Sequence, residues 1–401
     1  MSVASTSAEN SQRFDSVDAV RGTAMLFVFL SHFTSSYLWQ TGHSSLATDL
    51  AAVSMIASPT FVIVSGMVVG FMAASNAPAF LDLRIKLVDR GVFLLVVGHT
   101  LLALTQTQSL ADFPRAFRTS FITDAIGVAV IVGPWLINAL RAPARIAVAA
   151  GIFVFNWFAV IQWHPVGPFL TAAKKYVVGV PTHNAGTQAI LVFPFLAWFA
   201  VYLIATVLGE RVGTVFAKGD RKGAQWWLAK IGGACLLIAI SLHSLTKALR
   251  HTPTALDSPL PTFLSIYQKF PPGAVYLAFF GGAGIVLLAT IFEIDRRGTT
   301  PRAMSVLRSL GRASFFAFVA QYALYGAVLR RLALPYTPLW PLLFVLSIIV
   351  LTYSAVTWDR HRGNRFLTVG ITALVQRIRA PRGAGMAEPM FRHSTLSSKF
   401  G

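Results

Sequence analysis

Long apolar runs, separated by short polar gaps, recur along the whole chain. A bilayer core about 30 Å thick takes roughly 20 helical residues to cross, and each run is long enough to cross it. The runs are continuous, as in LLFVLSIIVLTY at 342–353, whereas the strands of a membrane barrel alternate between apolar and polar positions. The pattern therefore predicts an all-α, polytopic transmembrane helical bundle of about ten helices. Their expected ranges are 19–40, 50–74, 87–107, 121–140, 145–162, 188–208, 228–248, 273–293, 312–333 and 338–358.

The composition agrees with this prediction. Hydrophobic residues fill 55% of the 401 positions and charged residues only 12%, whereas soluble chains carry about 25% charged residues. This excludes a soluble globular enzyme, a disordered protein and a secreted disulfide-rich protein. The single cysteine, Cys235, permits no intrachain disulfide. No His, Asp or Glu set recurs at ligand spacing on one helix, so we expect no metal site.

The net charge of +19 would suggest a nucleic-acid partner if the chain were soluble. However, 25 of the 34 Lys and Arg residues fall on one predicted side of the membrane and nine on the other. Because cytoplasmic loops retain positive charge, we expect both termini in the cytoplasm of a multi-pass plasma (inner) membrane protein. The expected partners of the basic residues are anionic lipids, with no nucleic acid.

Three regions are expected along the chain. Residues 1–18 are a polar cytoplasmic segment, 19–358 form the transmembrane domain, and 359–401 form a basic cytoplasmic tail. Within the tail, 366–375 is too short to span and is expected at the membrane interface. The remainder has little apolar content and is expected to be disordered. In the bundle, Gly66 and Gly70 are spaced for close helix packing.

The entry into the first helix carries the most informative pair of residues. Arg21 and His32 are eleven residues apart, which places them within roughly 20° of one helix face and about 16 Å apart along the axis. Asp18 lies three residues before Arg21 and is expected to pair with it. An ionisable side chain at membrane depth is costly and usually marks a pathway or an active site. A neutral imidazole is also well suited to accept a proton near neutral pH, so His32 is the candidate base.

The stretch SVDAVRGTAMLFVFLSHF, with Arg21 and His32, resembles the first-helix signature of the integral-membrane acyltransferases. These comprise the acyltransferase-3 family and its relatives, including glucan succinyltransferases and heparan glucosaminide acetyltransferases. The segments SPTFVIVSGMVVGF (58–71), RIKLVDRGVFLL (84–95) and LGRASFFAFVAQYALY (310–325) resemble the same group. The resemblance implies an acyl-CoA donor, acetyl-CoA or succinyl-CoA, held from the cytoplasm. It also implies a glycan or glycolipid acceptor, and it gives His32 the role of general base or acyl carrier.

The resemblance also suggests where the phosphates of the donor bind. The paired arginines of the family fall on Arg84 and Lys86, and the lysine departs from that pattern because it lacks the guanidinium fork. Arg90 and Arg312 are further candidates, the latter expected after a helix N-cap at Ser309. A pantetheine arm of roughly 15–20 Å is comparable to the axial rise between Arg21 and His32. Each of these cations has the alternative role of a solvated positive charge at the interface.

Other polar residues are expected at depth in the bundle. Asp124 and Ser58 are the candidates for binding the acceptor, and His99, Gln162 and Gln321 are expected near the same path. For each of them, a hydrogen bond between helices is the alternative.

Two other classes of function fit the same pattern. A secondary transporter or permease for a sugar-like or lipid-linked substrate would also use long outer loops and polar residues at the midplane, although we find no internal repeat. A family member without activity, serving as a structural or sensory membrane protein, is the third alternative.

Overall fold

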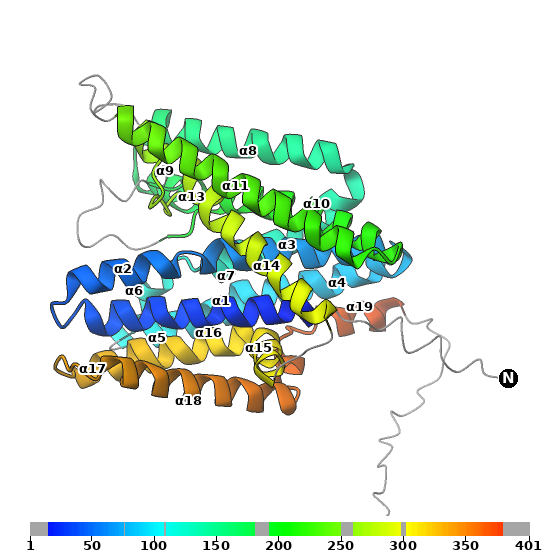
Figure 1. Cartoon of the computed structure of the whole chain (residues 1–401). Helices are drawn as coiled ribbons and strands as arrows, with labels where there is room; N and C mark the ends of the chain where they lie inside the picture. The colour runs from blue at the N-terminus through cyan, green and yellow to red at the C-terminus, as the bar shows by residue number, and fades with distance from the viewer. Residues whose placement is uncertain are drawn as a thin grey trace, which may run out of the picture.

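The computed structural model describes residues 15–75, 77–107, 110–180, 192–249, 260–297 and 302–379. These residues form an all-α bundle, which confirms the predicted fold class (Figure 1). The long helices are α1 (Asp15–Phe33), α3 (Ala57–Ser75), α4 (Ala77–Phe93), α7 (Ile122–Ala139), α8 (Ala142–Gln162), α10 (Phe195–Ala217), α11 (Arg221–Leu249), α14 (Gly282–Arg296), α15 (Arg302–Arg312) and α18 (Trp340–Arg360). Shorter helices are α2 (Ser44–Ser54), α5 (His99–Gln106), α6 (Phe113–Phe117), α9 (Pro168–Ala173), α12 (Leu260–Phe263), α13 (Ala274–Tyr276), α16 (Ser314–Tyr322), α17 (Arg330–Leu332) and α19 (Ile371–Arg379).

Several predicted spans contain a change in helix geometry. π-helical segments extend α1 through Leu38 and join α4 to α5, α13 to α14 and α16 to α17. The span expected at 50–74 is divided into α2 and α3, and the span expected at 312–333 begins after a 77° bend between α15 and α16. Ser309 is therefore inside α15, and its prediction as a helix N-cap is wrong because the chain bends at Ala313 instead.

Eight helical segments in the described residues are long and apolar enough to cross a membrane, and nine if the bent α15–α16 pair counts as one span. Of the ten predicted spans, only the first, which corresponds to α1, is missing from these nine described segments. Asp18, Arg21 and His32 lower the hydropathy of this helix. This helix lies inside the bundle and packs against α3, α14, α15, α16 and α18. Asp18 is therefore buried, and Arg21 and His32 are half-buried.

The helices lie in rows across the bundle (Figure 1). α8 and α11 run along one side, α1 and α3 run through the middle, and α16 and α18 run along the other side. Small residues allow the closest contacts between these rows. A methyl group at Gly70 of α3 would overlap the carbonyl oxygen of Thr206 in α10, and one at Gly22 of α1 would overlap that of Leu307 in α15. The prediction of close packing at Gly66 and Gly70 is confirmed.

The C-terminal segment after α18 folds back onto α4. Asp89 of α4 is buried, and its carboxylate accepts hydrogen bonds from the Thr368 hydroxyl (2.6 Å) and from the backbone N–H groups of Val369 (2.8 Å) and Thr372 (3.1 Å). This carboxylate satisfies free N–H groups at the start of α19. α19 overlaps the interfacial segment expected at 366–375, while the disordered part expected beyond about 380 and the predicted segment before Asp15 lie outside the described residues.

Candidate functional site

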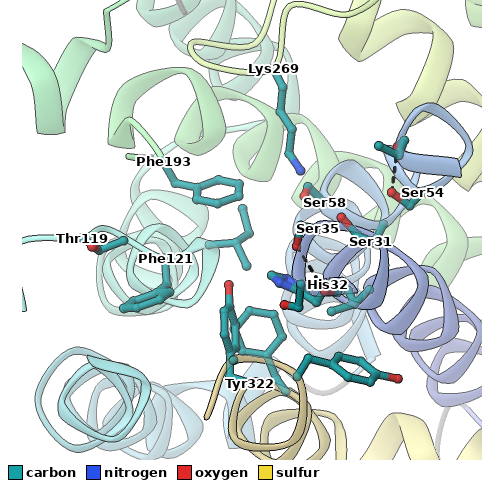
Figure 2. Close-up of a pocket in the computed structure, with 18 of the residues that line it drawn as sticks. Ser31, His32, Ser35, Ser54, Ser58, Thr119, Phe121, Phe193, Lys269 and Tyr322 are labelled. Atoms are coloured by element: carbon teal, nitrogen blue, oxygen red, sulfur yellow. Dashed lines mark hydrogen bonds between the residues drawn. The ribbon is translucent and has the colours of Figure 1, made fainter. Parts of the chain in front are cut away.

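A cavity of about 480 Å³ opens at the end of the bundle where α1 ends (Figure 2). We call this end of the bundle the His32 end, and the opposite end, where α1 begins, the Arg21 end. The cavity walls come from α1 and its π-helical extension, α2, α3, α16, and the segments before α7, α10 and α13. The polar side chains that line it are Ser31, His32, Ser35, Ser36, Ser54, Ser58, Gln106, Thr119, Ser120, Lys269, Tyr322, Tyr325 and Arg330.

His32 is half-buried in the wall of this cavity. Its imidazole packs against Tyr322, with ring centroids 4.4 Å apart, and meets the edge of Phe318 at 6.3 Å. Its ring nitrogens form no hydrogen bond with any of the residues that the structure describes. The cavity lining contains no Asp or Glu, so no carboxylate orients the ring as in a Ser-His-Asp triad. Aromatic packing holds the imidazole in place and leaves its nitrogens free to exchange a proton with a ligand.

Arg21 and His32 both face α16, as their spacing on one helix face predicts. The guanidinium Nη2 of Arg21 donates to the Ser314 hydroxyl at 2.8 Å, and its Nη1 lies 3.6 Å from the Asp18 carboxylate, which confirms the expected ion pair. Tyr322 lies eight residues after Ser314 and reaches His32. α1 and α16 are therefore in contact at both ends. Arg21 does not line the cavity.

The two predicted acceptor residues occupy different positions. Ser58 lines the cavity, but Asp124 does not. The Asp124 carboxylate accepts from the backbone N–H of Phe121 at 2.8 Å and contacts Nδ1 of His99 at 3.0 Å. His99 Nε2 in turn reaches the carbonyl oxygen of Phe117 at 2.9 Å. Asp124 thus caps the N-terminus of α7. It also holds in place the segment before α7, which lines the cavity.

Comparison with known proteins gives one match. Residues 13–253, more than half of the chain, match the family described as heparan-alpha-glucosaminide N-acetyltransferase, catalytic. The chain belongs to this family. Among proteins with curated functions, none gives a significant match. Family membership supports the acyltransferase class and does not favour a transporter.

The matched range of this acetyltransferase-family chain contains α1, the two predicted acceptor residues and the basic residues of α4. Gln162 and Gln321 do not line the cavity. Gln321 is buried, and its amide nitrogen donates to the carbonyl oxygen of Phe318 at 3.0 Å. This bond lies within α16, so the alternative of a hydrogen bond between helices is not observed for Gln321 among the described residues.

The cations predicted to bind donor phosphates have different surroundings in the acetyltransferase-family bundle. Arg84 lies over the ring of Trp135, 4.6 Å from its centroid, and its Nε is buried without a hydrogen bond. Lys86 and Arg90 are exposed on α4. Arg312 pairs with Asp359 at 2.7 Å and donates to Ser309 at 2.9 Å. Arg312 therefore already has a counter-charge in Asp359.

Sequence reasoning missed most of the cavity lining, including Tyr322 and Lys269. Tyr322 lies within the segment quoted for its resemblance, but only the fold shows that it faces His32. Lys269 lies in the segment between α12 and α13, where helical periodicity gives no signal. Burial lowers the pKa of Lys269 from an ordinary value of 10.5 to about 8. A positive charge outside the spans was visible in the sequence, but its position opposite His32 was not.

Proposed function

We propose that this chain transfers an acetyl group from cytoplasmic acetyl-CoA to a glucosamine-type acceptor that enters at the His32 end. The family supplies the reaction class, because its name specifies N-acetyl transfer to a glucosaminide. The observation that carries the proposal is the free imidazole of His32 in a cavity rich in hydroxyl groups. Such hydroxyls are suited to bind a sugar through hydrogen bonds.

His32 serves as general base or as acyl carrier in this proposal. As a base, its imidazole takes a proton from the acceptor amine or hydroxyl while the acceptor attacks the thioester carbonyl. The carbon–sulfur bond breaks, and the imidazolium returns the proton to the leaving CoA thiolate. As a carrier, the imidazole attacks the thioester and releases CoA, and the acceptor then attacks the acyl-imidazole. Both routes end with the acylated acceptor and free CoA.

Tyr322 is a candidate to stabilise the negative charge that develops on the carbonyl oxygen. Its hydroxyl points into the cavity on the side of His32 (Figure 2) and forms no hydrogen bond with the described part of the chain. A donor aimed at a developing oxyanion is typically worth several kcal/mol, about 3 for one hydrogen bond. The ring of Tyr322 positions His32, and its hydroxyl is available to the reacting carbonyl.

The donor is proposed to bind from the Arg21 end, with this end and both termini on the cytoplasmic side of the inner membrane. Arg21, Arg84, Lys86 and Arg90 would meet its phosphates, and Arg312 would do so only in competition with Asp359. The pantetheine arm would then bring the acyl group along α1 to His32. The proposal also covers a succinyl donor and a glycolipid acceptor. It further includes contact with anionic lipids and membership of the wider acyltransferase-3 group.

Replacing His32 by alanine tests the proposal. Transfer of radiolabelled acetyl from acetyl-CoA to glucosamine should be abolished in membrane vesicles, while binding of acetyl-CoA is retained. The matched control is His361→Ala, since His361 lies exposed at the end of α18 and away from the cavity lining. Undiminished transfer by the His32 variant would refute the proposal.

A further inference from the structure

Lys269 occupies the cavity wall opposite His32. Its side chain extends from the segment before α13 into the cavity, towards the side where Ser58 and His32 lie (Figure 2). The ammonium group lies over two aromatic rings, 5.5 Å from the centroid of Phe193 and 5.3 Å from that of Phe270. Such rings attract a cation but neutralise none of its charge.

The Lys269 ammonium has no counter-ion in the described part of the molecule. None of its hydrogen atoms is donated to another described residue, and the cavity lining holds no carboxylate. The second cation in the lining is Arg330, which is exposed at the start of α17. Lys269 is half-buried. A charge that lacks both a partner and full hydration is costly, and a ligand of opposite charge would offset this cost.

The hydroxyl groups around the cavity provide the rest of an anion site. Ser31 and Ser58 lie on the side towards which Lys269 points (Figure 2), as does Ser35, whose hydroxyl already donates to the backbone carbonyl oxygen of His32 at 3.1 Å. A hydroxyl can donate one hydrogen bond to an anionic oxygen, whereas a carboxylate in the same place would repel it. The exposed Arg330 adds a positive potential that favours the entry of anions into the cavity.

We infer that Lys269 binds an anionic group of one of the two substrates, a carboxylate, sulfate or phosphate, within the cavity that contains His32. The inference rests on the proposed function and specifies its substrate class. The anionic group can come from the acceptor, as in an acidic sugar, or from the acyl donor, as in a dicarboxylic acyl group. Lys269 is then a specificity-determining residue, since a neutral substrate gains nothing from its charge.

The test compares wild-type protein with Lys269→Gln and Lys269→Arg in a matched set of reactions. One arm compares glucosamine 6-sulfate with glucosamine as acceptors for acetyl-CoA, and the other compares succinyl-CoA with acetyl-CoA as donors to glucosamine. Lys175→Gln is the control, because Lys175 is also a lysine between predicted spans but does not line the cavity. Thermal unfolding checks that each variant is folded, and calorimetry with glucosamine 6-sulfate measures binding without turnover.

The Gln variant should raise KM for the anionic substrate by about tenfold to a hundredfold, and should raise KM for the neutral substrate much less. The Arg variant should restore most of the affinity, and the arm that responds identifies the substrate carrying the anion. An equal effect on anionic and neutral substrates, or no effect in either arm, would overturn the anion site and leave the proposed function standing. Binding of glucosamine 6-sulfate through Lys269 without any acyl transfer would overturn the proposed function and support the anion site.

Discussion

His32 and Tyr322 contact each other across the interface of α1 and α16, with ring centroids 4.4 Å apart and planes inclined by 58°. The same two helices are joined at the Arg21 end by the hydrogen bond from Arg21 to Ser314. The orientation of His32 therefore depends on the packing of α16 against α1. No carboxylate in the cavity lining orients the imidazole.

The hydroxyl and the ring of Tyr322 can be separated by mutation. Tyr322→Phe keeps the ring against His32 and should lower kcat about a hundredfold if the hydroxyl stabilises the oxyanion. Tyr322→Ala should lower kcat further, because His32 then loses its packing partner. Tyr325→Phe is the control, since the Tyr325 hydroxyl is already bonded to Ser347 at 2.6 Å. Unchanged acetyl-transfer kinetics in Tyr322→Phe would rule out a role for the hydroxyl.

Arg21 is expected to act on donor binding. Arg21→Ala should raise KM for acetyl-CoA about tenfold, because a charge-assisted contact with phosphate is lost, while KM for the acceptor stays the same. Ser314→Ala removes the hydroxyl bonded to Arg21 but keeps the cation, so a smaller effect is expected. Steady-state kinetics with each substrate varied in turn separates an effect on KM for acetyl-CoA from an effect on KM for the acceptor. If KM for acetyl-CoA is unaffected in Arg21→Ala, the donor does not contact this residue.

We expect the binding of an anionic substrate to depend on pH through the protonation of Lys269. Its pKa is lowered by burial to about 8, and only the protonated form binds an anion. KM for an anionic substrate should therefore rise as the pH increases through about 8, approaching tenfold per pH unit. The other titratable or charged side chains in the lining are His32, Tyr322, Tyr325 and Arg330.

Lys269→Arg should abolish this rise, since a guanidinium stays charged at these pH values. The measurement is the pH profile of KM for anionic and neutral substrates side by side. The same rise in Lys269→Gln would show that another group causes it.

Gly70 should be intolerant of substitution. A methyl group there would overlap the backbone of Thr206, and two packed helices cannot separate without losing other contacts. We expect Gly70→Ala to destabilise the protein by about 1–3 kcal/mol. Gly233→Ala is the control, because nothing lies within 4 Å of the added methyl and alanine favours a helix. Thermal unfolding in detergent measures both variants, and equal unfolding temperatures would contradict the close contact.

The predicted orientation can be tested with single cysteines in a Cys235→Ser background. A cysteine at His164, an exposed position after α8, should react with a membrane-impermeant maleimide on intact cells. A cysteine at Lys218, exposed between α10 and α11, should react only after the cells are opened. The reverse labelling pattern would place both termini outside and would exclude donor binding from the cytoplasm at the Arg21 end.

The fold class and the position of His32 could be predicted because they depend on local properties. Hydropathy locates the helices, and helical periodicity places Arg21 and His32 on one face. The pairing of Asp124 with His99 could not be predicted, since it depends on how the π-helical segment that leads into His99 packs beside α7. Lys269 was missed because its segment has no periodicity. The pairing of Arg312 with Asp359 likewise depends on packing between helices that are distant in the sequence.

The capture of the C-terminal segment by Asp89 determines where the chain can be shortened. A truncation after α18 would remove Thr368, Val369 and Thr372, and with them three hydrogen bonds to the carboxylate of Asp89 in the helix that carries Arg84. A hydrogen bond to a charged group contributes about 1.5–3 kcal/mol. The minimal folding unit therefore extends through Arg379, and fusion partners or purification tags belong after that residue and not at the end of the last spanning helix.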